Sequence, residues 1–322
     1  MRANIAFVFA ASAVFAAGCT PEPESPTAEA PPPAPSAPRG QVITVERGGF
    51  IPEGIEYDQA NGRFLTGSLA EGTIFVIERD GSVVPFIRDA DLVSSVGIEA
   101  DEPRDRLLVA NSDRAAFGGD APGQAKLGVY NLTTGERLAM VDLGAVLGAP
   151  APPKFFANDV TVDDEGNAYV TDTMNGVVYR VTSDYQASVL HRFMDLPQGA
   201  QLNGIVYHDA GYLLVVAGEH MYKVPVANAA GTTKVNVADP VAGQDGIVWA
   251  ADGRLVATSN SGTEPRLVAF RSNDDWATAQ RAGVAVLAGQ ATTAAAVDGE
   301  IWAVHPHFAD AERPTIEQGV FE

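Results

Sequence analysis

Four oxygen-bearing side chains stand at the same position of a pattern that recurs along the chain. They are Glu53 in PEGIEYD, Asn158 in ANDVTVDD, Asn203 in LNGIVYHD and Asp245 in QDGIVWAADG. Two carboxylates and two amide oxygens suit a hard divalent cation, above all Ca²⁺, which takes about six to eight oxygen ligands. The set contains neither Cys nor His, so zinc and copper are less favoured, and Mg²⁺, Mn²⁺ and Zn²⁺ remain alternatives to calcium.

The pattern itself is a repeat of strand, turn and strand. Each copy has a variable residue, a small one and an aliphatic one, then a turn rich in Asp, Asn or Gly and a second β-rich run. The copies start at Glu53, Val96, Asn158, Asn203, Asp245 and Thr293. Starts about 40 to 60 residues apart are typical of propeller blades. Third strands are expected at residues 72–78, 126–132, 176–182, 220–226 and 266–272.

The sequence therefore predicts an all-β fold, a six-bladed β-propeller whose blades have about four antiparallel strands. Residues 41–47 are expected to complete the last blade, which would close the ring and remove exposed sheet edges. Helical crossover connections are disfavoured, because the strands follow one another too closely.

Because the four oxygen ligands stand at the same position of the repeat, we expect them to lie close together in the folded propeller. A single Asn or Asp before Gly is a common turn former, but a turn does not explain why all four stand in one column. The first strand of each blade lines the central channel, so its first residue lies at one mouth. We therefore expect a metal site there. Val96 and Thr293 occupy the column in the other two blades and leave an uncharged side, from which substrate would approach.

The end of the second strand returns to the same face and predicts an outer ring of polar residues. Asn111, Asp172 and Ser259 are the predicted substrate-binding members. His305 is a predicted general acid or base, since an imidazole titrates near neutrality. The alternative is that His305 and His307 are only rim residues of the last blade.

The N-terminal residues predict export and lipidation. Arg2 precedes an apolar stretch at residues 5–17, which is too short to span a membrane in the usual way. The sequence Ala16-Ala17-Gly18-Cys19 resembles the bacterial lipobox, in which the cysteine is acylated. We expect a signal peptide at 1–18, an acylated Cys19 with a proline-rich tether at 19–40, and the propeller at 41–322. The protein would then be a membrane-anchored bacterial lipoprotein of the periplasm or cell surface.

Composition narrows the function classes. The net charge of −20 disfavours binding to nucleic acid or anionic lipid headgroups. Cys19 is the only cysteine, so the mature chain has no internal disulfide. No serine nucleophile elbow or phosphate-binding loop is present, and we expect a monomer.

The motifs PEGIEYD, ANDVTVDDEGNAYVTD, LNGIVYHD and QDGIVWAADGRL resemble the senescence marker protein/gluconolactonase family, which is related to the paraoxonases and diisopropyl fluorophosphatases. The resemblance extends at low similarity over most of residues 41–310. It implies a metal, usually calcium, held by Glu53, Asn203 and Asp245, with Asn158 contacting metal or substrate. It also implies that Asp245 acts as base or nucleophile. Phe156 stands where gluconolactonases often have Arg, which favours an apolar ester over a sugar lactone.

The leading expectation is thus a calcium-dependent hydrolase of lactones or related esters. The alternative is a non-catalytic propeller that presents one face to a protein or glycan partner, with a structural metal. Redox or quinone chemistry lacks support, because no tryptophan ring or cysteine pattern is present.

Overall fold

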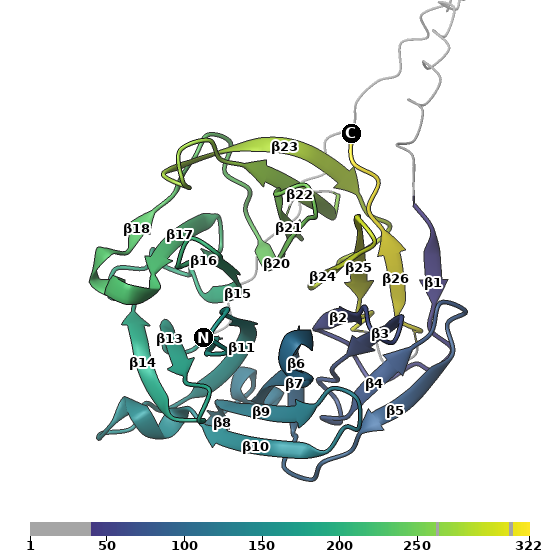
Figure 1. The fold of residues 1–322 in the computed structure, drawn as a ribbon, viewed down its shortest axis with the longest axis horizontal. Coiled ribbons are helices and arrows are strands. Elements are labelled where there is room, and N and C mark those ends of the chain that lie inside the picture. Colours follow the sequence, from purple (N-terminus) through teal and green to yellow (C-terminus); the bar gives the residue numbers. More distant parts are fainter. Residues whose placement is uncertain (1–39, 262–263, 309–311) are drawn as a thin grey trace, which may run out of the picture. The chain divides into compact units, whose positions relative to one another are not determined.

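Six sheets surround a central channel in the computed structural model, which describes residues 40–261, 264–308 and 312–322 (Figure 1). This confirms the predicted all-β, six-bladed propeller. The predictions for residues 1–39, including the signal peptide, Cys19 and the tether, lie outside the described residues. None of the helical turns within the described ranges is long and apolar enough to span a bilayer.

The first three blades follow one another along the chain, each running from the channel outwards. Blade one contains β2 (Ile55–Asp58), β3 (Arg63–Thr66), β4 (Ile74–Ile77) and β5 (Val83–Ile87). Blade two contains β6 (Ser94–Asp101), β7 (Arg106–Ser112), β9 (Lys126–Asn131) and β10 (Arg137–Asp142). Blade three contains β11 (Phe155–Val162), β12 (Ala168–Asp172), β13 (Val177–Val181) and β14 (Ala187–Arg192), with β8 (Gly123–Gln124) added in parallel to β11.

The remaining blades repeat the plan, and the last one joins both ends of the domain. Blade four contains β15 (Leu202–His208), β16 (Tyr212–Ala217), β17 (His220–Pro225) and β18 (Thr233–Lys234). Blade five contains β20 (Gln244–Trp249), β21 (Leu255–Ser259), β22 (Arg266–Arg271) and β23 (Thr278–Val286), with β19 (Asn236–Val237) parallel to β23. Blade six contains β24 (Ala294–Val297), β25 (Glu300–His305), β26 (Thr315–Gln318) and β1 (Val42–Thr44).

The pairing of β1 with β26 confirms that the N-terminal strand closes the ring. Four short 3₁₀ helices lie among the described loops: η1 (Glu102–Arg104), η2 (Arg114–Phe117), η3 (Gly144–Leu147) and η4 (Val226–Gly231).

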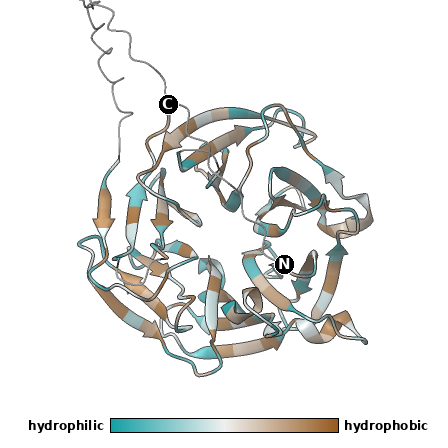
Figure 2. Ribbon diagram, turned by 180° about the vertical axis from the view of Figure 1, so that it is seen from behind, coloured by the Kyte–Doolittle hydropathy of each residue, from teal (hydrophilic) through white to brown (hydrophobic). Residues whose placement is uncertain are grey.

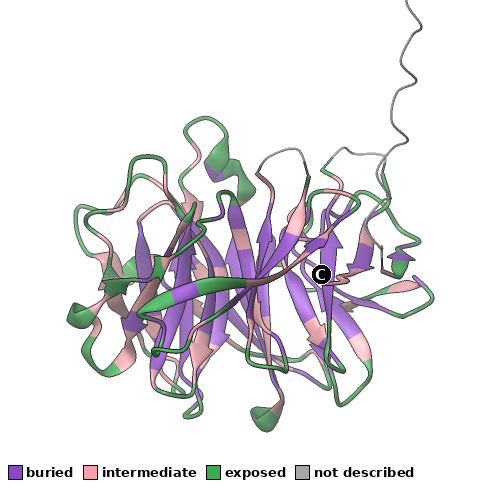
Figure 3. Ribbon diagram, turned by 90° about the horizontal axis from the view of Figure 1, so that it is seen from above, coloured by how far each residue is buried: buried purple, intermediate pink, exposed green. Residues whose placement is uncertain are grey.

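The apolar core lies between the blades. Apolar residues concentrate within the strands, and the exposed residues gather in the loops at both ends of the blades (Figures 2 and 3). Each of six buried clusters joins two neighbouring blades, and the cluster with Phe64 and Trp302 joins the first to the last. Burial of apolar surface contributes roughly 25 cal/mol per Å², so these interfaces hold the ring together.

Small residues in the second column of the repeat let the inner strands approach closely. A Cβ added at Gly54 would lie 2.3 Å from Val96 O, and one at Gly246 would lie 2.3 Å from Thr293 Cβ. Backbone bonds join the same neighbours, since Gly54 N donates to Val96 O at 3.1 Å and Gly246 N donates to Thr292 O at 2.8 Å. The glycine column therefore forms the narrow inner wall of the channel.

Candidate functional site

The four predicted ligands all stand where the innermost strands begin, at one mouth of the channel, which we call the ring mouth. Glu53 precedes β2, Asn158 lies in β11, Asn203 in β15 and Asp245 in β20. In blades three, four and five the strand register shifts across these positions, between residues 157 and 160, 202 and 205, and 244 and 247. Such bulges release a residue from the ladder and redirect its side chain. The sequence folds in this way because each ligand is followed by Gly or, after Asn158, by Asp159.

Three of the four ligands interact directly. Burial raises the pKa of Glu53 well above its usual value, and the charge of Asp245 raises it further. Burial also raises the pKa of Asp245 to about 7, while a hydrogen bond with the Asn203 side chain lowers it. The two carboxylates are therefore close enough to repel each other, and no Lys or Arg contributes to either shift. Such a site favours a bound cation.

Asn158 belongs to the same mouth, but its amide group has protein partners. Its Nδ2 donates to Thr173 Oγ1 at 2.9 Å, and that hydroxyl donates to Leu202 O at 2.8 Å. The side chain is 6% exposed. With the nitrogen engaged, the carbonyl oxygen of Asn158 is the atom that remains for a ligand.

The ring mouth fits a hard divalent cation by its chemistry. It offers two carboxylates and the amide oxygens of Asn158 and Asn203, which are ligands that calcium accepts. Within the described ranges no three His, Cys, Asp or Glu side chains form a ready-made metal cluster. The two carboxylates would therefore need the amides, water or substrate to complete the coordination.

The predicted outer ring has a different setting. Asn111, Asp172 and Ser259 are each 0% exposed. Asp172 accepts hydrogen bonds from three backbone N–H groups and from the Asn175 and Tyr179 side chains, at 2.9 to 3.3 Å.

The other two also bond within the protein. Asn111 Nδ2 donates to Asp91 O at 2.7 Å, and Ser259 Oγ donates to Ala242 O at 3.0 Å. In this arrangement Asn111, Asp172 and Ser259 hold loops in place, and their predicted role in substrate binding stays a prediction.

His305 is also buried, inside blade six. It is 1% exposed; its Nδ1 lies 3.0 Å from Gln290 O and its Nε2 lies 3.1 Å from Glu317 Oε2. This setting ties β25 to its neighbours and gives the imidazole no contact with the channel cavity described below. His307 contacts Glu312 Oε2 at 2.9 Å and Thr315 Oγ1 at 3.2 Å. The structure thus places both histidines among protein partners in blade six, and the acid–base role of His305 stays a prediction.

Phe156 packs in the interface between blades two and three and is 3% exposed. Its ring contacts that of Phe117 in η2, with the centroids 4.7 Å apart. Phe156 therefore packs between two blades, and the preference for apolar esters stays a prediction.

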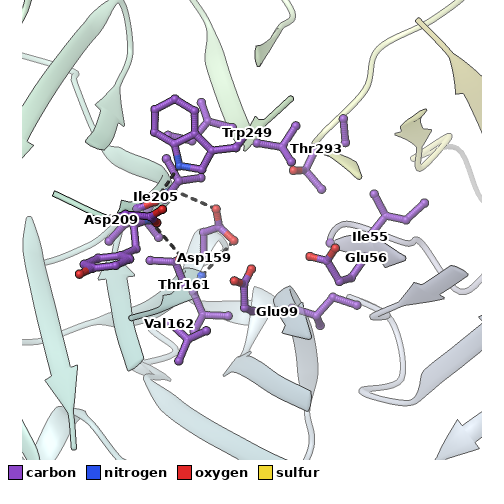
Figure 4. A pocket seen from close by; sticks show the side chains of 18 of the residues that line it. Ile55, Glu56, Glu99, Asp159, Thr161, Val162, Ile205, Asp209, Trp249 and Thr293 are labelled. Carbon is purple, nitrogen blue, oxygen red and sulfur yellow. Dashed lines mark hydrogen bonds between the residues drawn. The ribbon is translucent and has the colours of Figure 1, made fainter. Parts of the chain in front are cut away.

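A second group of carboxylates lies deeper in the channel and was not singled out from the sequence. Glu56, Glu99 and Asp159 line a cavity of about 290 Å³, which we call the channel cavity (Figure 4). Glu56 and Glu99 share the fourth position of the repeat in blades one and two, and Asp159 fills the second column, which is otherwise Gly or Ala. The alignment of the repeats that gave the ring mouth could have found them.

Burial raises the pKa of each of these three acids. It raises the pKa of Glu56 to about 8 and that of Asp159 to about 7, and that of Glu99 well above its usual value, with Glu56 and Asp159 adding to the last. Asp159 also raises the pKa of Glu53 and Asp245, so it is the acid common to both groups. Its own oxygens accept bonds from Val160 N at 2.9 Å and Ile205 N at 3.1 Å.

The sequence matches no protein-family model and no curated protein. Solved structures resemble the fold. The Malassezia sympodialis allergen Mala s 1 superposes with a TM-score of 0.67 at 18% identity, covering 88% of this chain and 96% of that one. A gluconolactonase from Xanthomonas campestris gives 0.60 at 15% identity, covering 88% and 99%. Regucalcin from Agrobacterium tumefaciens, a calcium-binding protein, gives 0.60 at 16% identity, covering 88% and 94%. These likenesses show the six-bladed propeller fold.

Proposed function

We propose that this protein is a metal-dependent hydrolase of lactones or related esters, with its active site at the ring mouth. The observation that carries the proposal is the convergence of the Glu53 and Asp245 carboxylates with the Asn203 amide at the start of three inner strands. The gluconolactonase with the same fold supports a lactone as the substrate class.

Calcium is the metal we propose, and Glu53, Asn158, Asn203 and Asp245 would hold it. Calcium held by these residues would supply a positive charge that polarises the carbonyl group of the ester or lactone. The calcium-binding neighbour supports this choice.

The protein's own residues supply the proton transfer. The Asp245 carboxylate acts as base, taking a proton from the water that adds to the substrate carbonyl carbon, or as nucleophile at that carbon. In the first case the carbon–oxygen bond to the leaving alkoxide breaks, and the proton held by Asp245 passes to that alkoxide. In the second case that bond breaks as the acyl–Asp245 anhydride forms, the alkoxide takes a proton from water, and water hydrolyses the anhydride to regenerate the Asp245 carboxylate. Asn203 orients Asp245 through its hydrogen bond, and burial keeps the carboxylate basic.

Hydrolysis of a panel of alkyl γ- and δ-lactones, sugar lactones and simple esters tests the proposal. With calcium present we expect turnover that chelator abolishes and that Asp245→Asn lowers by about 100-fold or more in kcat/KM. Asp209→Asn, an exposed acid at the opposite end of the channel, is the control and should retain activity. Calcium binding without turnover of any substrate would instead support the scaffold function.

We also propose export and membrane anchoring through Cys19. Mass spectrometry of the N-terminal peptide of the mature protein should find an acylated cysteine, and Cys19→Ser should release the protein from the membrane fraction. An unmodified N-terminus on wild-type protein would contradict this.

A further inference from the structure

The channel cavity lies on the far side of the glycine column from the ring mouth. Its walls include the fourth positions of the inner strands, and its rim includes Asp164 and Asp209 from the turns that follow β11 and β15. We call this end of the channel the turn mouth. Both rim acids are exposed. None of the residues lining the cavity is Lys, Arg or His. The cavity is therefore lined by negative charge without a cationic partner.

The carboxylates within the cavity are poorly satisfied by the protein. The Glu99 side chain is half-buried, borders the cavity and accepts no hydrogen bond from the described part of the chain. Glu56 accepts one bond, from the backbone N–H of the next residue, Tyr57, at 3.1 Å. Both side chains point toward the centre of the cavity (Figure 4). Partly buried carboxylates with few or no donors are unfavourable, and a positively charged ligand would offset that cost.

The opposite wall is aromatic. Trp249 lines the cavity from blade five and Tyr207 from blade four. The indole Nε1 of Trp249 donates to Tyr207 O at 2.7 Å, which fixes the orientation of the ring. An aromatic wall facing a pair of acids suits alkylammonium groups, which bind carboxylates and aromatic faces alike.

The spacing of the acids argues against a single metal ion. Glu56, Glu99 and Asp159 come from three blades, and no three acids within the described ranges lie close enough together to form a metal cluster. A ligand that carries separated positive charges on an apolar stem matches both this spread of acids and the aromatic wall. A volume of about 290 Å³ is at the small end of the range for ligand pockets, about 300 to 1,000 Å³.

We propose that the channel cavity is a binding site for a small aliphatic diamine or polyamine, entered from the turn mouth. Glu56 and Glu99 bind the inner ammonium group, Trp249 and Tyr207 contact the alkyl stem, and Asp164 and Asp209 attract the outer ammonium group. This site does not depend on the proposed hydrolase function, since none of the four proposed metal ligands lines the cavity.

Isothermal titration calorimetry of amine binding to the propeller tests the site. Residues 1–40 are removed for this experiment because they precede the first strand. The same titration is then carried out on the full-length chain in detergent. The probes are 1,4-diaminobutane and spermidine, titrated at constant ionic strength, with 1-butanol as the uncharged comparison. We expect saturable binding of the amines and none of the alcohol. Glu99→Gln should weaken binding by about tenfold or more, because the shape is kept and one charge is lost.

The matched control is Glu165→Gln, an exposed acid in the same turn as Asp164 that does not line the cavity. It should change the affinity by less than about twofold, as expected of a screened surface charge. If Glu99→Gln fails to fold, Glu56→Gln provides the same test. Asp245→Asn should retain amine binding, which separates this site from the ring mouth.

Three results would overturn the proposal. One is the absence of saturable amine binding to the wild-type protein. A second is equal loss of affinity in Glu99→Gln and Glu165→Gln, which would mean a non-specific surface effect. A third is binding of Mg²⁺ or Ca²⁺ that is abolished by Glu99→Gln and is not displaced by the amines. That result would assign the cavity to an inorganic cation.

Discussion

The two ends of the channel carry acids from the same repeat but surround them differently. At the ring mouth Asp245 has an amide partner in Asn203, and Asn158 adds a further amide oxygen. In the channel cavity Glu56 and Glu99 face Trp249 and Tyr207 across open space. Neither end contains a cationic side chain among these groups. Both are therefore suited to cations, and the spacing and the neighbours decide which kind: a hard metal ion where oxygens converge, an extended amine where acids spread out.

The largest effect is expected from a substitution in the glycine column, which separates the ring mouth from the channel cavity. In Gly246→Ala the new Cβ meets Thr293 Cα at 2.8 Å as well as its side chain, so blades five and six must separate. We expect a loss of about 3 kcal/mol or more in the free energy of unfolding, or failure to fold, together with loss of binding at both ends. Thermal and urea denaturation measure it.

Gly118→Ala is the control for that change. Gly118 has an ordinary φ of −120°, and an added Cβ meets no atom closer than 4.0 Å. Its stability should stay within about 0.5 kcal/mol of wild type. Equal stability of the two alanine variants would mean that the inner strands are not closely packed at Gly246.

The next test uses the raised pKa values. Because the folded state binds protons more tightly than the unfolded chain at Glu56, Glu99 and Asp159, stability is complete below the unfolded pKa of about 4.5 and falls as pH rises toward about 8. In metal-free protein we expect a loss of about 2 kcal/mol between pH 5.5 and pH 8. Urea denaturation at a series of pH values measures it.

Glu99→Gln should flatten that pH dependence and raise stability at pH 8 by about 1 kcal/mol, since it removes one of the repelling acids. Glu165→Gln, on the surface, should follow the wild-type curve. A wild-type protein whose stability rises between pH 5.5 and pH 8 would contradict the enclosed, unneutralised state of these acids.

The smallest effect is expected at the ring mouth. Asn203→Ala removes an amide oxygen and the partner of Asp245, and should weaken calcium binding by about tenfold with the fold retained. Calorimetric titration with calcium measures this, with Asn273→Ala, an exposed position after β22, as control. Unchanged calcium affinity in Asn203→Ala would remove this residue from the metal site.

The sequence predicted the fold well, because each blade repeats one local unit. The turn and the first strand with its small second residue recur in nearly every copy, so the blade count and the ring closure by residues 41–47 could be inferred. The column of Glu53, Asn203 and Asp245 could be found because alignment of the repeats places equivalent residues at equivalent points of the ring.

The burial and hydrogen-bond partners of the other candidate site residues could not be inferred from the repeat. Whether a polar side chain at the end of a second strand faces the channel or its own loop depends on tertiary contacts, as the five bonds to Asp172 show. His305 is held against Glu317, a residue of the next strand that no local pattern connects to it. Asp159 was overlooked because the second column was taken to be small throughout, although alignment of the repeats shows it as the exception.

The sixth blade has a consequence for how the molecule is made. Its outermost strand, β1, belongs to the start of the domain and its neighbour β26 to the end, so Val42 pairs with Glu317. During synthesis, β1 must wait for its partner until nearly all of the chain has emerged. Until then β1 has no strand partner, and the cluster around Phe64 and Trp302 is incomplete. Long-range pairing of this kind slows folding and leaves strands free to aggregate. The nascent protein would therefore gain most from a chaperone in the interval before its final strand arrives.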